Sequence, residues 1–277
     1  MAETEHYQLV MDLEPMKEGR KKVDPHLFLH RVAQDVEHVA SRIAEHYAVE
    51  PGAYGSKMRM WMWEEAEDHE SAMGRFLGTV TRGDFKLLGK APVFSVWREP
   101  GLFDSVEVVR SLFVHNAGHM LISNLYAPLW VGDRGGGWLD AGVGHWYEYD
   151  SMERSVHYCI EESTTPLNYH GGEWRAPIRK RLEDGSESDF HLGRLLPMNS
   201  GAMTLPDQAL CWSFYDWLVA EHMATLPGIL RRLKKREPAR EILPDVLGMD
   251  LFEVERSWRK WVSDVYPRRG DKPRKPK

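Results

Sequence analysis

The residues with the clearest chemical potential are two histidines, His115 and His119, in the run His-Asn-Ala-Gly-His. On a helix, residues four apart lie on the same face, close enough for both imidazoles to hold one metal ion. In a hydrolytic site of this kind, a glutamate directly after the first histidine acts as the general base. That position is Asn116 here, and a neutral amide cannot serve as a base. The spacing therefore indicates a metal-site architecture without its usual base.

A second helix is predicted over residues 138–149, and it contains two glycines, Gly142 and Gly144. A glycine inside a helix costs up to ~1 kcal/mol relative to alanine, so two of them need a packing reason. Removing side-chain bulk lets one helix approach another backbone closely. We therefore expect this helix to pack tightly on the helix that carries His115 and His119.

Two histidines alone rarely hold zinc, because catalytic zinc sites use three protein ligands. His145 is the candidate for a third ligand, with Glu148 or Asp133 as the base of such a site. Asp140 is a poorer candidate, since it points about 100° around the helix from the next residue. The opposite interpretation is that histidines continuing an apolar stripe are buried core residues without a ligand.

The rest of the chain must position these helices. Alternating apolar residues predict strands, and helical spacing predicts helices, in the order 6–12 (strand), 25–48 (helix), 57–63 (strand), 64–76 (helix) and 91–97 (strand). The next helix begins near Ser105, where Asp104 and Glu107 form a capping-box pair. The pair Asp184-Gly185 between two segments predicts a hairpin, and the chain beyond position 206 is predicted to be helical.

Composition excludes several classes of function. The 277-residue chain carries a net charge of −6 and lacks the basic face that nucleic acid requires. No apolar run reaches the ~20 residues of a membrane span, and the first residues do not form a signal peptide, which favours a cytoplasmic protein. Cys159 and Cys211 are too few for a disulfide framework, and we expect buried thiols. Residues 267–277 are basic and proline-rich, and we expect a disordered tail.

In their order along the chain, these motifs resemble those of the gluzincin metallopeptidases, which have a thermolysin-type fold. The family pattern is His-Glu-x-x-His, then a helix reading approximately Trp-Leu-x-Glu-Gly whose glutamate is the third zinc ligand. On this chain the two histidines fall on His115 and His119, the catalytic glutamate falls on Asn116, and the third-ligand glutamate falls on Ala141.

The resemblance implies an α+β, zincin-like fold. Its parts would be an N-terminal mixed β-sheet with helices, a two-helix active-site region and a helical C-terminal lobe. We expect a single metallopeptidase-like unit over residues 1–266, with sub-lobes of about 1–150 and 151–266.

Because both motif glutamates are missing, the resemblance implies an inactive pseudopeptidase that keeps a cleft for a peptide or protein segment. The strand over residues 93–97 would form the rim of this cleft, and the ligand would contact Val93, Ser95, Trp97 and Trp138. No cofactor is expected in that case. Two alternatives remain: a zinc-dependent hydrolase that uses His115, His119 and His145, and a structural protein without a working cleft.

Overall fold

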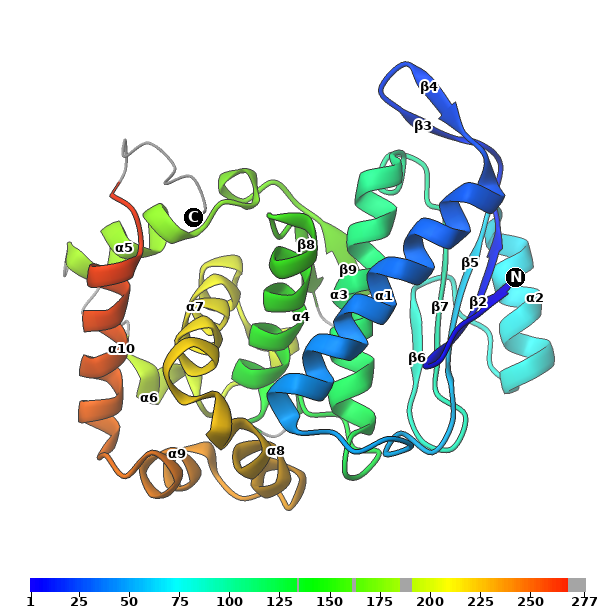
Figure 1. Cartoon of the computed structure of the whole chain (residues 1–277). Helices are drawn as coiled ribbons and strands as arrows, with labels where there is room; N and C mark the ends of the chain where they lie inside the picture. Colours follow the sequence, from blue (N-terminus) through cyan, green and yellow to red (C-terminus); the bar gives the residue numbers. More distant parts are fainter. Residues whose placement is uncertain (134, 161–162, 185–190, 269–277) are drawn as a thin grey trace.

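Figure 1 shows the computed structural model of the chain, which describes residues 1–133, 135–160, 163–184 and 191–268. A mixed β-sheet lies at one end and a group of helices at the other. Between them, α3 (Val106–Asn124) and α4 (Gly137–Met152) pack side by side. One continuous core cluster contains residues from Tyr7 to Tyr266. The expected α+β class with a mixed N-terminal sheet is confirmed, and the gluzincin assignment stays a prediction.

The main sheet has the strand order β1-β2-β5-β7-β6. Its three central strands run parallel, and they are the three predicted ones: β2 (Tyr7–Asp12), β5 (Met58–Trp63) and β7 (Val93–Trp97). The two edge strands are antiparallel to their neighbours: β1 (Ala2–Glu3) and β6 (Phe85–Leu87).

Strand β6 was not predicted, because three residues are too few to show an alternating pattern. It pairs with the outer edge of β7, with Lys86 opposite Phe94. The cleft rim expected at residues 93–97 has no free strand edge over residues 93–95, because β7 pairs there with β6 as well as with β5.

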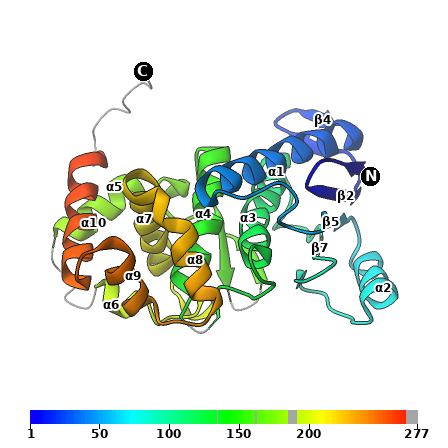
Figure 2. The same cartoon turned by 60° about the horizontal axis from the view of Figure 1, so that its bottom comes forward.

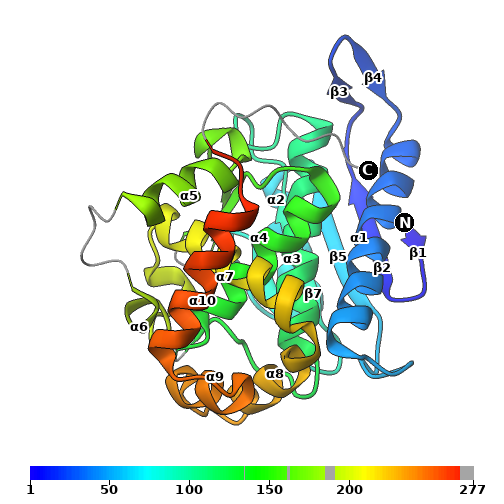
Figure 3. The same ribbon diagram turned by 60° about the vertical axis from the view of Figure 1, so that its left-hand side comes forward.

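Helices cover both faces of this sheet (Figure 2). On one face lies α1 (Pro25–Tyr47), which begins at Asp24; the Asp24 carboxylate accepts from the N–H groups of His26 and Leu27. Its apolar stripe packs on α3 and β2. On the other face lies α2 (Ala66–Leu77), where Met73 packs with Trp61 of β5. The short hairpin of β3 (Met16–Glu18) and β4 (Lys21–Val23) projects beyond α1 (Figure 3).

The histidine-bearing helix α3 begins one residue later than predicted. Its N-cap is Ser105, whose hydroxyl oxygen accepts from the N–H of Val108 at 3.2 Å. Asp104 instead accepts from the N–H of Gly101 at 3.0 Å, in the preceding turn. Most residues of α3 are buried, as expected for a helix with apolar residues on more than one face.

Two glycines of α4 make contacts that no larger residue could make. A Cβ at Gly144 would lie 2.4 Å from Nε2 of His119, so α4 approaches α3 directly at the histidines. A Cβ at Gly142 would lie 2.9 Å from the carbonyl oxygen of Cys211, on α7 (Leu205–His222). The predicted close packing on α3 is confirmed for Gly144, whereas Gly142 makes room for α7.

The helices after position 170 form a lobe around α7 (Figure 3). They are α5 (Arg175–Glu183), α6 (Leu192–Leu195), α8 (Leu226–Lys234), α9 (Ala239–Leu247) and α10 (Leu251–Val265). A capping box of Asp250 and Glu253 opens α10. No helix within the described part of the chain combines the length and apolar character that crossing a bilayer requires.

The structure bears on two further predictions for this half of the chain. The hairpin predicted around Asp184 is wrong on its first side, because Ile178 and Leu182 lie on one face of α5 and pack against the core; its second side begins with residues 185–190, which lie outside the described residues. Residues 269–277 of the expected disordered tail also lie outside the described residues.

The glycine contacts make a stability prediction. We expect Gly142→Ala to destabilise the fold by about 1–3 kcal/mol, the usual cost of overpacking a core, because the new methyl group meets the Cys211 carbonyl and Tyr215 Cβ. Gly228→Ala, in α8, is the matched control. Nothing lies within 4 Å of its Cβ position, so stability should stay unchanged or rise by up to ~1 kcal/mol. Urea unfolding measures both, and equal stability of the two variants would contradict the close contact.

Candidate metal centre

The two histidines of α3 converge as predicted. Their Nε2 atoms lie 3.0 Å apart, and both side chains are fully buried. The rings meet edge to face, with centroids 4.7 Å apart. The i, i+4 spacing therefore produces the shared position that the sequence analysis expected.

Each histidine is oriented by a buried carboxylate. The Nδ1 atom of His115 lies 3.1 Å from Glu148, and the Nδ1 atom of His119 lies 2.7 Å from Asp140. Because an ionised carboxylate can only accept, both Nδ1 atoms carry the hydrogen. In a neutral imidazole the lone pair is then on Nε2, so both lone pairs point at the same place.

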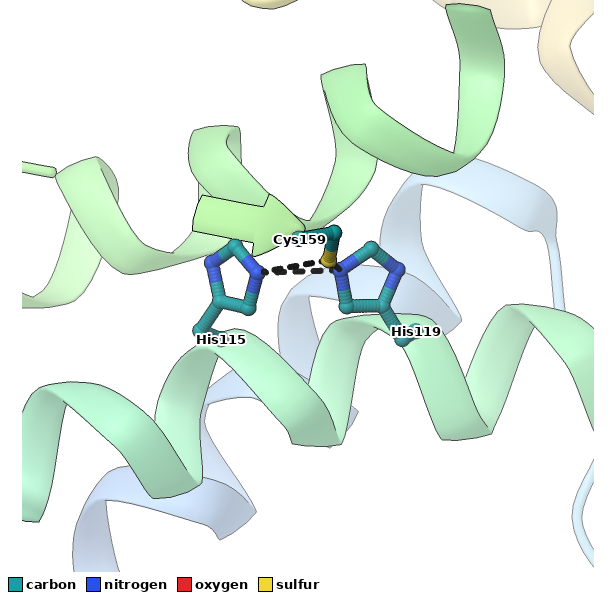
Figure 4. Close-up of side chains that lie close together, drawn as sticks. All are labelled: His115, His119 and Cys159. Atoms are coloured by element: carbon teal, nitrogen blue, oxygen red, sulfur yellow. Dashed lines mark hydrogen bonds between the residues drawn. The ribbon is translucent and has the colours of Figure 1, made fainter. Parts of the chain in front are cut away.

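A third donor reaches this position from another part of the chain. The Sγ atom of Cys159 lies 3.2 Å from His119 Nε2 and 3.6 Å from His115 Nε2 (Figure 4). Cys159 lies on β8 (His157–Ile160), which pairs with β9 (Ser163–Pro166) in a hairpin against α3 and α4. These three residues form a buried group that could hold a metal ion. The cysteine is a free, buried thiol, as expected.

Glu148 is the centre of the hydrogen-bond network behind His115. Its carboxylate accepts from side chains of α3, the turn before β8 and β8 itself: Ser111, His115, Ser155 and His157. It also accepts from the backbone N–H groups of Val156 and His157. Burial alone raises the pKa of Glu148, but hydrogen bonds from His115, His145 and His157 outweigh burial and hold this pKa well below its usual range.

The two histidines of α3 differ in their electrostatic surroundings. Burial holds the pKa of His115 well below its usual value, although Glu148 opposes this. Burial also lowers the pKa of His119, but Asp140 and Cys159 outweigh it and raise this pKa to about 10. A proton on Nε2 of His119 can form a hydrogen bond to Nε2 of His115. A bound cation would occupy the same position between the two rings.

His145, the candidate third ligand, has a different role in this structure. Its Nε2 atom lies 2.9 Å from Oε1 of Gln208, whose amide nitrogen donates to the carbonyl oxygens of Cys159 and Met203. Because the Gln208 oxygen must accept, His145 Nε2 is the donor and offers no lone pair to a metal, while the other ring nitrogen, Nδ1, lies 3.0 Å from the Ser155 hydroxyl. His145, His115 and Glu148 also form a close group, but the His115 atom nearest Glu148 is the Nδ1 that already donates.

Asn116, at the general-base position, uses both ends of its amide. Its nitrogen donates to the carbonyl of Leu112 at 2.9 Å, and its oxygen accepts from the Thr164 hydroxyl at 3.3 Å. Thr164 also accepts from the ammonium of Lys86, which forms an ion pair with Asp84 at 3.0 Å. Asn116 is therefore part of a buried polar network that links α3 to β9 and to the β6 region.

Most of the residues predicted to bind a peptide lie inside the protein. Val93, Ser95 and Trp138 are buried, and Ser95 is hydrogen-bonded to His69 and Trp63. The indole of Trp97, which is partly exposed, donates to the carbonyl of Arg82. Ala141, at the third-ligand position of the resemblance, is buried in α4.

Sequence reasoning missed Cys159 as a neighbour of the histidines, and it gave Asp140 and Glu148 other roles. The signal for the two carboxylates was their place on the helix that packs against α3. No spacing rule connects Cys159 to His115, because they come together only through the fold.

No protein-family model matches the chain, and no curated protein matches it significantly. What the site can do is therefore inferred from the positions and contacts of its own residues.

The Glu148 network makes a second stability prediction. We expect Glu148→Gln to destabilise the protein by about 3 kcal/mol or more, because it leaves several buried donors without an accepting oxygen and each unsatisfied donor costs about 1–3 kcal/mol. Glutamine has the size of glutamate, but its amide N–H₂ group would face the N–H and O–H groups that now donate to Glu148. Glu107→Gln is the control: Glu107 pairs with Arg154 at the surface, with 59% of its side chain exposed, so its loss should cost at most about 1 kcal/mol. If urea unfolding shows that both variants lose the same stability, the Glu148 network does not contribute more to the fold than a surface ion pair does.

Proposed function

We propose that the protein binds a divalent transition metal at His115 and His119 and is not a peptidase of the usual gluzincin mechanism. The observation that carries this proposal is the 3.0 Å convergence of the two Nε2 atoms in a buried position. Two imidazole lone pairs at that distance repel each other unless a cation lies between them. A proton can relieve this repulsion between two nitrogen atoms only. A metal ion can accept a lone pair from each donor atom around it.

The residues around the histidines fit a metal. Histidines that bind metals almost always donate their other ring N–H to a carboxylate or carbonyl, which fixes the ring and raises its basicity. Glu148 and Asp140 occupy those places behind His115 and His119. A bound ion would supply Lewis-acid chemistry or local rigidity, while these carboxylates orient the two rings.

Neither Asn116 nor Glu148 supplies the general base that a peptidase of this kind needs. Asn116 cannot take a proton from water, and its amide is held by Leu112 and Thr164. Glu148, which we considered as a substitute base, is buried and accepts from several donors. Neither residue has a free basic oxygen to offer to a metal-bound water.

The gluzincin resemblance supports the proposal through the order of its parts. A mixed sheet, the histidine helix, a second helix packed on it and a helical lobe follow one another along the chain. The peptide-binding role expected at residues 93–97 is weakened, because β6 occupies the edge of β7 over residues 93–95. We therefore propose metal binding as the function and do not propose a peptide-binding groove beside β7.

Metal content tests the proposal directly. Protein incubated with zinc and freed of the excess should hold about one zinc per chain, because the two buried Nε2 atoms converge on one position. His119→Ala should lose this zinc. The exposed pair His26 and His30, whose Nε2 atoms lie 3.2 Å apart, is a second possible binding pair, so all measurements use the His26→Ala/His30→Ala background. Protein that holds no zinc, even after zinc is added and excess removed, would overturn the proposal.

Peptidase assays give the second test. We expect no chelator-sensitive cleavage of unstructured peptides, because a positioned general base contributes ~10²–10⁴ in rate and an amide does not replace it. Asn116→Glu returns the carboxylate and is the variant in which slow cleavage should appear, if the metal leaves room for water. Robust cleavage by the unmodified protein, abolished in His119→Ala, would contradict the non-peptidase part of the proposal.

A further inference from the structure

We propose that Cys159, as a thiolate, is the third protein ligand of this metal, so that the site is a His₂Cys set closed by the β8–β9 hairpin. The inference rests on the metal-binding function proposed above and adds the ligand, the class of metal and the segment that the metal holds in place. It replaces the carboxylate that the resemblance would put at position 141, which is Ala141 here.

The distances fit a single ion. Zinc binds imidazole nitrogen at about 2.0–2.1 Å and thiolate sulfur at about 2.3 Å; in a tetrahedron this puts two nitrogens about 3.3 Å apart and a nitrogen and a sulfur about 3.5 Å apart. The observed separations are 3.0 Å between the two nitrogens and 3.2 and 3.6 Å from them to Cys159 Sγ. The three donors therefore already form one face of such a tetrahedron.

The backbone around Cys159 is held on both sides. On one side, the N–H groups of Val156 and His157 donate to Glu148, the same carboxylate that orients His115. On the other side, the carbonyl of Cys159 accepts from the amide of Gln208 at 2.8 Å. The sulfur is thus presented to the histidines by two independent contacts, one from α4 and one from α7.

The donor set selects the class of metal. A thiolate with two imidazoles suits zinc, cobalt or copper, whereas magnesium and calcium take oxygen ligands. The carboxylates Glu148 and Asp140 stand behind the rings, each within hydrogen-bond distance of an Nδ1 atom, and do not join the three converging atoms. A divalent ion would also offset the negative charge that these buried groups bring together.

The other cysteine is a built-in control. Cys211, on α7, is also free and buried, and its sulfur lies 3.7 Å from the sulfur of Met203. It belongs to neither group of possible metal donors in the described part of the chain. Replacing Cys211 removes a buried thiol of the same kind without removing a donor from the site.

Cobalt titration tests the inference, because a cobalt–thiolate bond has its own charge-transfer absorption in the near ultraviolet. The proteins are the His26→Ala/His30→Ala background and that background with Cys159→Ser or Cys211→Ser. We expect the background and Cys211→Ser to bind about one cobalt with this absorption. Cys159→Ser should lose the absorption and bind more weakly, by more than the ~10–100-fold that outer-shell changes cost.

A second measurement does not depend on a Cys159 variant that folds. In Cys211→Ser the only thiol is Cys159, and zinc should slow its alkylation by iodoacetamide, followed by mass spectrometry under native conditions. Binding of one cobalt without thiolate absorption, together with alkylation that zinc does not slow, would overturn the Cys159 assignment and leave the two-histidine proposal standing. Absence of any metal binding by the background protein would overturn the proposed function itself.

Discussion

The structure around the site depends on one buried carboxylate, that of Glu148. A charge removed from water is costly unless donors surround it, and Glu148 accepts from α3, from the turn after α4 and from β8. These contacts determine where three separate segments meet. They orient the ring of His115, and they place the backbone of the hairpin that carries Cys159. The same interaction therefore supports the fold and arranges two of the three converging donors.

Close helix packing is the second requirement, and it depends on small residues. Gly144 brings α4 against the ring of His119, and Asp140, one turn earlier on the same helix, reaches the other side of that ring. With a larger residue at 144, the two helices would stand further apart and the hydrogen bond from His119 to Asp140 would be lost. The glycines that lower the helix propensity of α4 thus make the histidine environment possible.

Much of the fold could be predicted from local patterns. Helix α1 has a clear helical period, α3 was located by its start signal and its apolar residues, and successive residues of β5 such as Met60 and Trp61 face opposite sides of the sheet. Short elements could not be predicted, because β6 has three residues and carries no periodic signal. That omission matters: β6 covers the edge of β7, where a peptide-binding rim was expected. The apparent hairpin near Asp184 failed for a different reason, since core contacts of Ile178 and Leu182 favour a helix.

The sequence by itself determined that His115 and His119 share a helical face, that Asn116 removes the usual base, and that a glycine-containing helix packs against them. The shared face follows from the helical period, the missing base from the residue type at 116, and the close packing from the glycines of the second helix. Only the tertiary structure decided which group lies beside the two histidines. His145 has a spacing as suggestive as that of His119, yet it donates to Gln208, whereas Cys159 reaches the histidines from a hairpin. No local pattern encodes that difference, because it arises from contacts between segments far apart along the chain.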